Sequence, residues 1–413
     1  MEIKKIQIKN FKNFKDTTVN LNKFNAIVGE CASGKSNFIE ALKFLNEISE
    51  DFEKTILKHG TSLMQNVKIK NNQPTSFKIL INYNKPLHNK KTEISKNFKS
   101  NIYYTDVEYE LCFNFKGNKC NIISENIKFD FSVYENEFLN SKLYTKNSLI
   151  YKNNGKEVKA KFKNNDEYCD LEYFAPQTIL QIINNNIKQK PQLLINSPLN
   201  VIPIPWIEIF KSISIYDFNP KFSKNIYNNG DINLKEDGGN LSFILDDILN
   251  DNEKKEHFLL VLSNLLPYIE NIDVEHIRDN QRIFLLFEKY ADTPIFAPFV
   301  SDGTANILAL ICALYFSNND VLIFEEPERN IHPGLFIDLI SMMKELNKQV
   351  IISTHSPEIL DYCKLNDILL ISRTKEGYSK ITEPKNNNDV VEFVKDLGIG
   401  QVFLNNYLGF KNE

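Results

Sequence analysis

Residues 24–37 read FNAIVGECASGKSN, a short apolar run followed at once by a glycine-bearing loop. Gly29, Gly34, Lys35 and Ser36 occupy the fixed positions of the pattern G-x-x-x-x-G-K-[ST]. After Ser36 the apolar residues recur at helical spacing, so the segment predicts a strand, a loop and a helix in that order. In this arrangement backbone N–H groups and the positive end of the helix converge on a phosphate group.

The loop therefore predicts a nucleotide site. Lys35 would reach the β- and γ-phosphates of ATP, and the hydroxyl of Ser36 would bind Mg²⁺. A glycine turn that carries Lys-Ser by chance is the plain alternative, which the flanking strand and helix disfavour. The residues predicted to bind ATP in this loop are Gly29, Glu30, Cys31, Ala32, Ser33, Gly34, Lys35, Ser36 and Asn37.

Two more apolar runs end in chemically active side chains. Residues 321–324 are followed by Glu325 and Glu326, and residues 349–353 are followed by a Thr-His-Ser-Pro segment that contains His355. Ligands of open α/β sheets collect at the carboxyl ends of the strands. We therefore predict that Glu325 binds Mg²⁺ with Ser36, that Glu326 activates the attacking water, and that a neutral His355 senses the γ-phosphate. The plain alternative is two acids that solvate a strand end and a structural histidine.

Composition limits the class of protein. The chain has 413 residues, 42% hydrophobic and 25% charged, which is typical of a globular protein with more than one domain. Its 49 basic and 53 acidic side chains exclude a surface coated in positive charge, so any contact with DNA must be local. The six cysteines form no CxxC pair, and no run approaches the roughly 20 apolar residues that span a bilayer. We expect a cytoplasmic protein without a membrane partner.

The pattern along the chain predicts a discontinuous core. In segments 1–49 and 290–413, buried strands alternate with helices, which indicates an α/β fold with a mostly parallel sheet. Segment 50–289 shows short alternating runs and then, from Leu241, helical spacing. We predict that this segment is an inserted β-rich and helical lid or arm. No apolar heptad pattern lasts for three heptads, which argues against a long coiled coil.

Five blocks of sequence resemble the ABC-type ATPases of the RecF, SMC and OLD kind, especially the standalone bacterial AAA15/AAA21-like ATPases. The blocks are FNAIVGECASGKSN (24–37), DGGNL (237–241), SDGTANILAL (301–310), VLIFEEPERNIHP (321–333) and VIISTHSPEILD (350–361). The resemblance implies a P-loop NTPase with an ABC-type head that hydrolyses ATP, and we expect slow turnover. It also implies a signature motif, which binds the γ-phosphate held by another copy and consists of Ser301, Asp302, Gly303 and Thr304. Without the resemblance, these four residues would indicate an ordinary helix N-cap.

The resemblance further implies how the copies assemble. Two copies would meet head to tail as a homodimer, or in a higher oligomer, with ATP at each interface, and hydrolysis would loosen the assembly. Glu326 would be the catalytic base, His355 the switch histidine, and residues 328–332 the loop that communicates across the dimer. Arg329 would either add positive charge near this interface or remain a solvated surface residue.

The sequence departs from the family pattern at three points. Glu325 stands where the family usually has an aspartate, and Glu30-Cys31 replaces the preferred Pro-Asn. The glutamine that contacts Mg²⁺ in the family has no clear equivalent, and Gln65 and Gln73 are the nearest candidates.

Two functions remain open at this point. The first is an ATPase that gates or scaffolds a separate effector protein, such as a nuclease, in phage defence. The second is a RecF/SMC-like ATPase that acts on DNA in repair or maintenance. We favour the first because the overall charge is not positive and because we expect the chain after His355 to be too short for the nuclease domain of OLD proteins. A transport ATPase and an adenylate-kinase-like enzyme fit the late motifs poorly.

Overall fold

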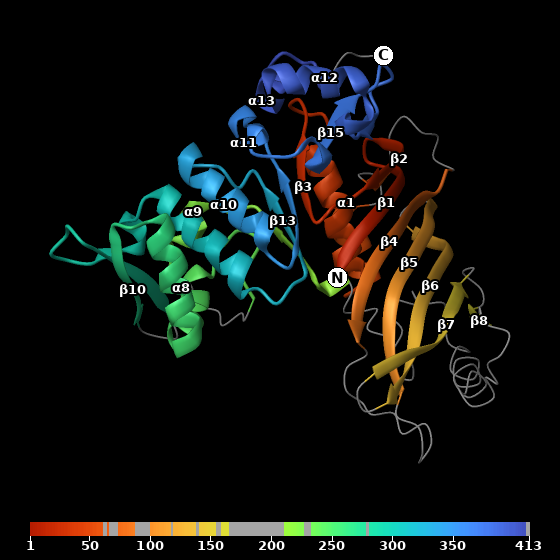
Figure 1. Cartoon of the computed structure of the whole chain (residues 1–413), viewed down its shortest axis with the longest axis horizontal. Coiled ribbons are helices and arrows are strands. Elements are labelled where there is room, and N and C mark those ends of the chain that lie inside the picture. Colours follow the sequence, from red (N-terminus) through yellow and green to blue (C-terminus); the bar gives the residue numbers. More distant parts are fainter. Residues whose placement is uncertain are drawn as a thin grey trace.

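A single large sheet runs through the computed structural model of the protein (Figure 1). Its thirteen strands are ordered β8-β7-β6-β5-β4-β1-β2-β16-β15-β3-β14-β13-β9, and a second sheet has the order β10-β11-β12. The structure describes residues 1–60, 64–65, 73–86, 100–116, 119–137, 140–153, 158–164, 210–226, 233–277 and 281–409.

The parallel half of the large sheet consists of five neighbouring strands, β15, β3, β14, β13 and β9. They form from short apolar runs, and nearly all of their residues are buried because helices cover both faces. The strands are β3 (Phe24–Val28), β9 (Ile213–Tyr216), β13 (Val321–Glu325), β14 (Gln349–Ser353) and β15 (Ile368–Arg373).

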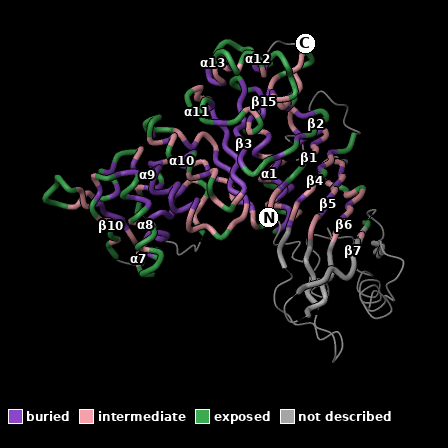
Figure 2. The backbone as a smooth tube through the Cα atoms, in the orientation of Figure 1, coloured by how far each residue is buried: buried purple, intermediate pink, exposed green. Residues whose placement is uncertain are grey.

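Alternate residues of these strands face two separate cores. Ile27 and Ile351 pack with helix α1 on one face, whereas Ala26 and Ile352 pack with α9 and α10 on the other. Figure 2 shows the buried residues following the central strands and the helices beside them. The helices are α1 (Lys35–Ile48), α2 (Phe52–His59), α6 (Pro220–Ser223), α7 (Leu241–Leu249), α8 (Asn252–Leu265), α9 (Asp302–Ile311), α10 (Pro333–Glu345), α11 (Pro357–Asp361), α12 (Asn388–Leu397) and α13 (Ile399–Leu404).

The other half of the sheet is an antiparallel ribbon, which extends to one side of the molecule in orange and yellow (Figure 1). It joins the parallel half at a narrow seam, where β2 and β16 share a single pair of residues, Phe14 and Ser379. The strands of this half are β1 (Glu2–Phe11), β2 (Phe14–Asn20), β4 (Thr75–Pro86), β5 (Ser100–Lys116), β6 (Lys119–Glu137), β7 (Asn140–Asn153) and β8 (Val158–Asn164). On the other side of the seam, β16 (Ser379–Thr382) pairs antiparallel with β15.

A helical lobe lies on the other side of the parallel strands (Figure 1). In this lobe α7 and α8 pack against α9 and against the small sheet of β10 (Ile269–His276), β11 (Arg282–Glu288) and β12 (Ile295–Phe296). The longest helices in the described part of the chain, α1 and α8, have 14 residues each. None of the described helices is long and apolar enough to cross a membrane.

The fold class predicted from the sequence is confirmed: an α/β P-loop fold with a parallel sheet, a β-rich segment and a helical part. The predicted strands at 321–324 and 349–353 and the helix after Ser36 are present. The sheet nevertheless crosses the expected boundary at residue 49, because β4 pairs with β1 and β9 pairs with β13. The segment 50–289 therefore contributes strands to the central sheet as well as to the ribbon.

Candidate active site

The loop between β3 and α1 has a shape that only glycine allows at two points. Gly34 has a φ of 120°, a conformation that side-chain-bearing residues rarely adopt, and a Cβ there would lie 2.6 Å from Nδ2 of Asn13. At Gly29 a Cβ would lie 2.7 Å from Oγ of Ser33 and still closer to the carbonyl oxygen of Ile371. The loop therefore lies tightly against the neighbouring strand β15 and the turn after β1.

Residues far away in the sequence hold this loop in place. Arg373, at the end of β15, donates to the carbonyl oxygen of Ala32 from Nε at 2.8 Å and from Nη2 at 2.6 Å. The hydroxyl of Ser379 on β16 donates to the carbonyl oxygen of Ser33. No motif in the sequence marks Arg373 or Ser379, because their role depends on the long-range pairing of β15 with β3.

Lys35 is buried against its own loop. Its ammonium donates to the carbonyl oxygens of Gly29 at 2.9 Å and Glu30 at 3.1 Å. Burial lowers the pKa of Lys35, and the opposing effect of Cys31, Glu326 and Glu325 does not cancel it. The other predicted loop residues differ in access to solvent: Glu30, Cys31, Ala32 and Ser36 are exposed, whereas Gly29, Ser33 and Gly34 are buried and Asn37 is half-buried.

The two predicted magnesium ligands lie in direct contact, since the hydroxyl of Ser36 donates to Oε1 of Glu325. One hydroxyl and one carboxylate are the hard oxygen donors that Mg²⁺ prefers, with phosphate oxygens and waters completing the shell. Glu325 is one methylene longer than the aspartate usual in the family, and its carboxylate contacts Ser36 of the loop. The described residues hold no cluster of three or more His, Cys, Asp and Glu that could bind a metal without phosphate oxygens.

Glu326 and His355 are also neighbours, as expected from their positions at the ends of adjacent strands. The Nε2 atom of His355 lies 3.6 Å from Oε1 of Glu326. Burial, together with the positive charge of Lys35, lowers the pKa of His355, and Glu326 opposes this shift only in part. The imidazole is therefore neutral at pH 7, which is the form that can both accept and donate a hydrogen bond.

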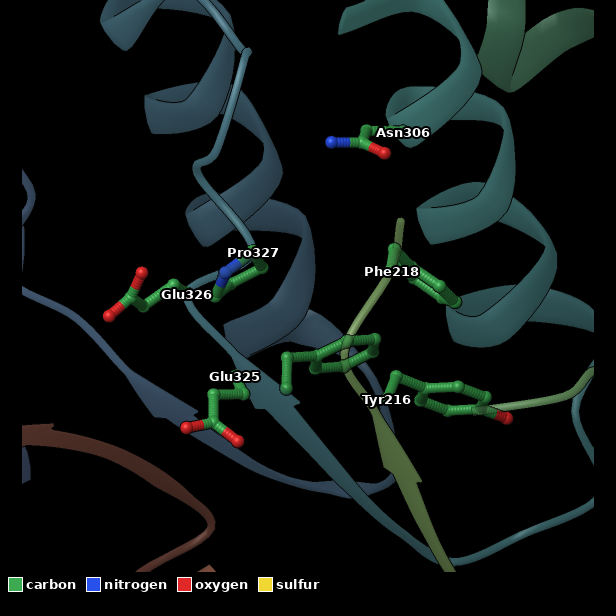
Figure 3. A pocket seen from close by; sticks show the side chains of 7 residues that line it. Tyr216, Phe218, Asn306, Glu325, Glu326 and Pro327 are labelled. Carbon is green, nitrogen blue, oxygen red and sulfur yellow. The ribbon is translucent and has the colours of Figure 1, made fainter. Parts of the chain in front are cut away.

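The backbone at Glu326 is unusual. Its φ of 43° is a left-handed conformation that costs a non-glycine residue on the order of 1 kcal/mol or more. A hydrogen bond of 3.1 Å from its N–H to the carbonyl oxygen of Ser353 fixes it against β14. Figure 3 shows the carboxylates of Glu325 and Glu326 pointing away from the aromatic rings of Tyr216 and Phe218.

A third acid, Glu328, supports the histidine. Its Oε1 accepts hydrogen bonds from the hydroxyl of Thr354 at 2.6 Å and from the backbone N–H of His355 at 3.4 Å. Burial raises the pKa of Glu328, although these hydrogen bonds act in the opposite direction. Glu328 thus fixes the turn that carries His355, a role that the sequence alone did not suggest.

Strand β9 adds an acid that the motifs did not reveal. Tyr216, at its end, stacks on Phe324 of β13 with ring centroids 5.3 Å apart, and Asp217 follows at the same edge of the sheet. Figure 3 shows Tyr216 and Phe218 beside the two glutamates, on the side away from their carboxylates.

The two glutamines considered as magnesium contacts do not reach the predicted metal ligands. No hydrogen bond within the described ranges connects Gln65 or Gln73 to Ser36 or Glu325. The carbonyl oxygen of Gln73 accepts a hydrogen bond from the side-chain amide of Asn10.

The predicted signature segment caps helix α9. Oγ of Ser301 accepts a hydrogen bond from the N–H of Thr304 at 3.1 Å, and Asp302 pairs with Lys224. Gly303 packs so closely on the carbonyl oxygen of Asn330 that no Cβ would fit. Ser301 and Asp302 are nevertheless exposed. Among the described residues, no hydrogen bond or ion pair joins this segment to the loop 29–36 of the same chain.

Comparison with known proteins gives one decisive result: the AAA ATPase domain family matches residues 1–360. The chain belongs to this family. The match covers all the motifs of the site, including His355, and confirms the AAA ATPase family expected from the sequence. Among curated proteins, no match to this chain was found.

Solved structures similar to this AAA ATPase domain include SMC heads. An SMC head bound to the C-winged-helix domain of ScpA is 13% identical, with 92% of this chain and 98% of that chain covered and a TM-score of 0.49. The SMC head domain from Thermotoga maritima is 13% identical, with 93% and 99% covered and a TM-score of 0.41. An Smc head with an extended coiled coil, bound to the C-terminal domain of ScpA derived from Pyrococcus furiosus, is 13% identical, with 95% and 99% covered and a TM-score of 0.45.

Proposed function

We propose that the protein is a Mg²⁺-dependent ATPase whose copies close head to tail around ATP. In this proposal the ATP-driven assembly gates or scaffolds a separate effector protein, such as a nuclease, in phage defence. Turnover is slow, because assembly and release of the copies accompany each hydrolysis event.

The residues of one chain divide the work of hydrolysis. The backbone N–H groups of the loop and Lys35 bind the phosphates, while Ser36 and Glu325 would hold Mg²⁺, which neutralises charge on the β- and γ-phosphates. Glu326 orients the attacking water and accepts its proton. Neutral His355 donates a hydrogen bond to the γ-phosphate. Glu328 holds the turn that carries His355, because its carboxylate accepts hydrogen bonds from Thr354 and from the backbone N–H of His355.

The observation that carries the proposal is the contrast between two parts of the site. The phosphate loop, both glutamates and His355 converge at the carboxyl ends of the parallel strands. The segment 301–304 begins at the exposed Ser301 and, among the described residues, makes no polar contact with the loop of its own chain. A helix N-terminus with an exposed serine suits a phosphate group. A second copy is the natural source of that phosphate.

The test uses Glu326→Gln, which keeps the size of the side chain but removes the base. We expect this variant to bind ATP, to lose at least about 100-fold in hydrolysis, in the usual range for a general base, and to accumulate as a dimer with ATP. Light scattering measures the mass, and phosphate release measures turnover. Lys35→Ala is the matched control, because without its ammonium we expect neither ATP binding nor a dimer.

Hydrolysis at the wild-type rate by Glu326→Gln would contradict the assignment of the base. Persistence of a monomer with ATP bound would contradict the head-to-tail assembly. Adding duplex DNA to the wild-type protein separates the proposed scaffold from the DNA-maintenance alternative. Acceleration of ATP loss severalfold, suppressed by salt, would favour the alternative.

A further inference from the structure

Arg329 forms a bridge between two acids at the site. Its Nε donates to Oε2 of Glu326 at 2.8 Å, and its Nη1 donates to Oδ1 of Asp217 at 2.8 Å. Oε1 of the same Glu326 faces Nε2 of His355 at 3.6 Å. Both oxygens of the proposed base therefore already face nitrogen atoms of its own chain.

The same turn is fastened to the signature helix. The side-chain amide of Asn306 on α9 donates to the carbonyl oxygen of Arg329 at 2.8 Å. One turn of helix earlier, Gly303 lies against the carbonyl oxygen of Asn330, where a Cβ would be too close. Figure 3 shows Asn306 reaching from its helix towards the loop that carries Glu326 and Pro327. A shift of α9 must therefore displace the backbone of Arg329.

We propose that Arg329 is a positioning residue that holds Glu326 away from the attacking water until the segment 301–304 engages the nucleotide of a second copy. Engagement moves α9, the hydrogen bond from Asn306 moves the turn, and the guanidinium leaves Oε2 of Glu326. This inference rests on the proposed function and adds to it the coupling between assembly and catalysis.

The strength of the contact suits such a role. A charge-assisted hydrogen bond from an arginine is worth about twice a neutral one, yet in a half-exposed pair it remains small enough for assembly to break. Asp217 gives the guanidinium a second partner, so that Arg329 has a defined place to stay when it leaves Glu326. The sequence left two alternatives for Arg329, a positive charge near the interface or a solvated surface residue. Its contacts with Glu326 and Asp217 argue against the second.

The test compares hydrolysis by wild-type protein and Arg329→Ala at concentrations where light scattering shows single copies. We expect Arg329→Ala to hydrolyse ATP about three- to tenfold faster per subunit, the gain from removing one charge-assisted contact. The rate should also depend less on protein concentration than in the wild type. Arg329→Lys keeps the charge and should restore much of the wild-type behaviour.

Two controls make the result specific. Lys254→Ala, which removes an exposed ion pair between Lys254 of α8 and Asp247 of α7, should leave the rate unchanged. Adding Glu326→Gln to Arg329→Ala should abolish the acceleration, because the released base is then absent. A purely structural role for Arg329 would lower stability but would not raise the rate of dilute protein.

The outcomes separate the two proposals. If the wild-type rate depends on Glu326 but Arg329→Ala is equal to or slower than wild type, the positioning role is wrong and the proposed ATPase stands. If even the wild type shows no Glu326-dependent hydrolysis, the proposed function itself is wrong.

Discussion

The side chain of Glu47 ties helix α1 to helix α2. Its two oxygens contact Nε2 of His59 at 2.6 Å and Nζ of Lys58 at 2.6 Å. Burial alone would raise the pKa of Glu47, but the hydrogen bonds from His59 and Lys58 outweigh it and lower the pKa to about 2, against a usual value of 4.5. The charged form is therefore favoured by folding.

This shift predicts how stability changes with pH. Because the folded pKa lies below the unfolded one, the stabilising effect is complete above about pH 4.5 and is lost as the pH falls towards 2. At pH 7 we expect Glu47→Gln to reduce the free energy of unfolding by about 1–3 kcal/mol. The difference from wild type should shrink in acid, as measured by urea unfolding at pH 7 and pH 3.

Glu50→Gln, an exposed acid three residues further along, is the matched control and should change the free energy of unfolding little. A deficit for Glu47→Gln that stays constant between the two pH values would show that the loss comes from packing instead of charge.

At this scale the sequence predicted which side chains lie close together, but only where a residue sits inside a local motif. Ser36 and Glu325 are 289 positions apart, and both were placed because each follows its own apolar strand. Arg373, Asp217 and the supporting role of Glu328 were not predicted. Each acts through a partner brought close by the order of the strands, which neither spacing nor residue type encodes.

Helix α1 is held by an aromatic cluster beneath the sheet. Phe44 is fully buried, and its ring centroid lies 5.9 Å from that of Phe11, 5.4 Å from that of Phe77 and 5.8 Å from that of Phe113. These rings come from α1, β1, β4 and β5, so the cluster connects the helix after the phosphate loop to the antiparallel ribbon.

Removing the central ring should be costly for that reason. We expect Phe44→Ala to reduce the free energy of unfolding by about 3–5 kcal/mol, since it removes buried area and leaves a cavity among three rings. Phe393→Ala on α12, where the side chain is 41% exposed, should cost much less. Urea unfolding of both variants measures the difference, and equal losses would show that the cluster relaxes around the missing ring.

Elements with a strong local pattern were predicted close to their true bounds, and those without one were missed. The runs with apolar centres, 321–324 and 350–352, lie in β13 and β14, because a buried parallel strand needs apolar residues on both faces. Strand β9 has four residues and was not recognised, although it lies beside β13 and positions Asp217. The position of β9 in the sheet involves the stacking of Tyr216 on Phe324, a contact between segments that lie over 100 residues apart in the sequence.

For the whole molecule, the proposed signature segment 301–304 is the place to test whether the protein works alone. We expect Ser301→Arg to bind ATP with an affinity close to wild type, because the segment makes no polar contact with its own phosphate loop. The bulky cation should prevent assembly and reduce hydrolysis by 10-fold or more, about the loss of one good transition-state contact. Fluorescent nucleotide binding, light scattering and phosphate release measure the three properties.

Ser263→Arg, on the exposed face of α8, is the matched control for adding a large cation to a surface serine. Normal assembly and turnover by Ser301→Arg would mean that the segment 301–304 is only a helix cap.

The narrow seam between β2 and β16 lies beside the phosphate loop. Six residue pairs join β1 to β2 and four join β15 to β16, but β2 and β16 share only the pair of Phe14 and Ser379. Hydrogen bonds from the backbone N–H of Ser379 to the carbonyl oxygen of Asn13 and from Thr17 to the carbonyl oxygen of Ser379 reinforce this short contact. The hydroxyl of Ser379 also holds the carbonyl oxygen of Ser33. One side chain thus serves both the joint between the two halves of the sheet and the loop that we propose binds the phosphates.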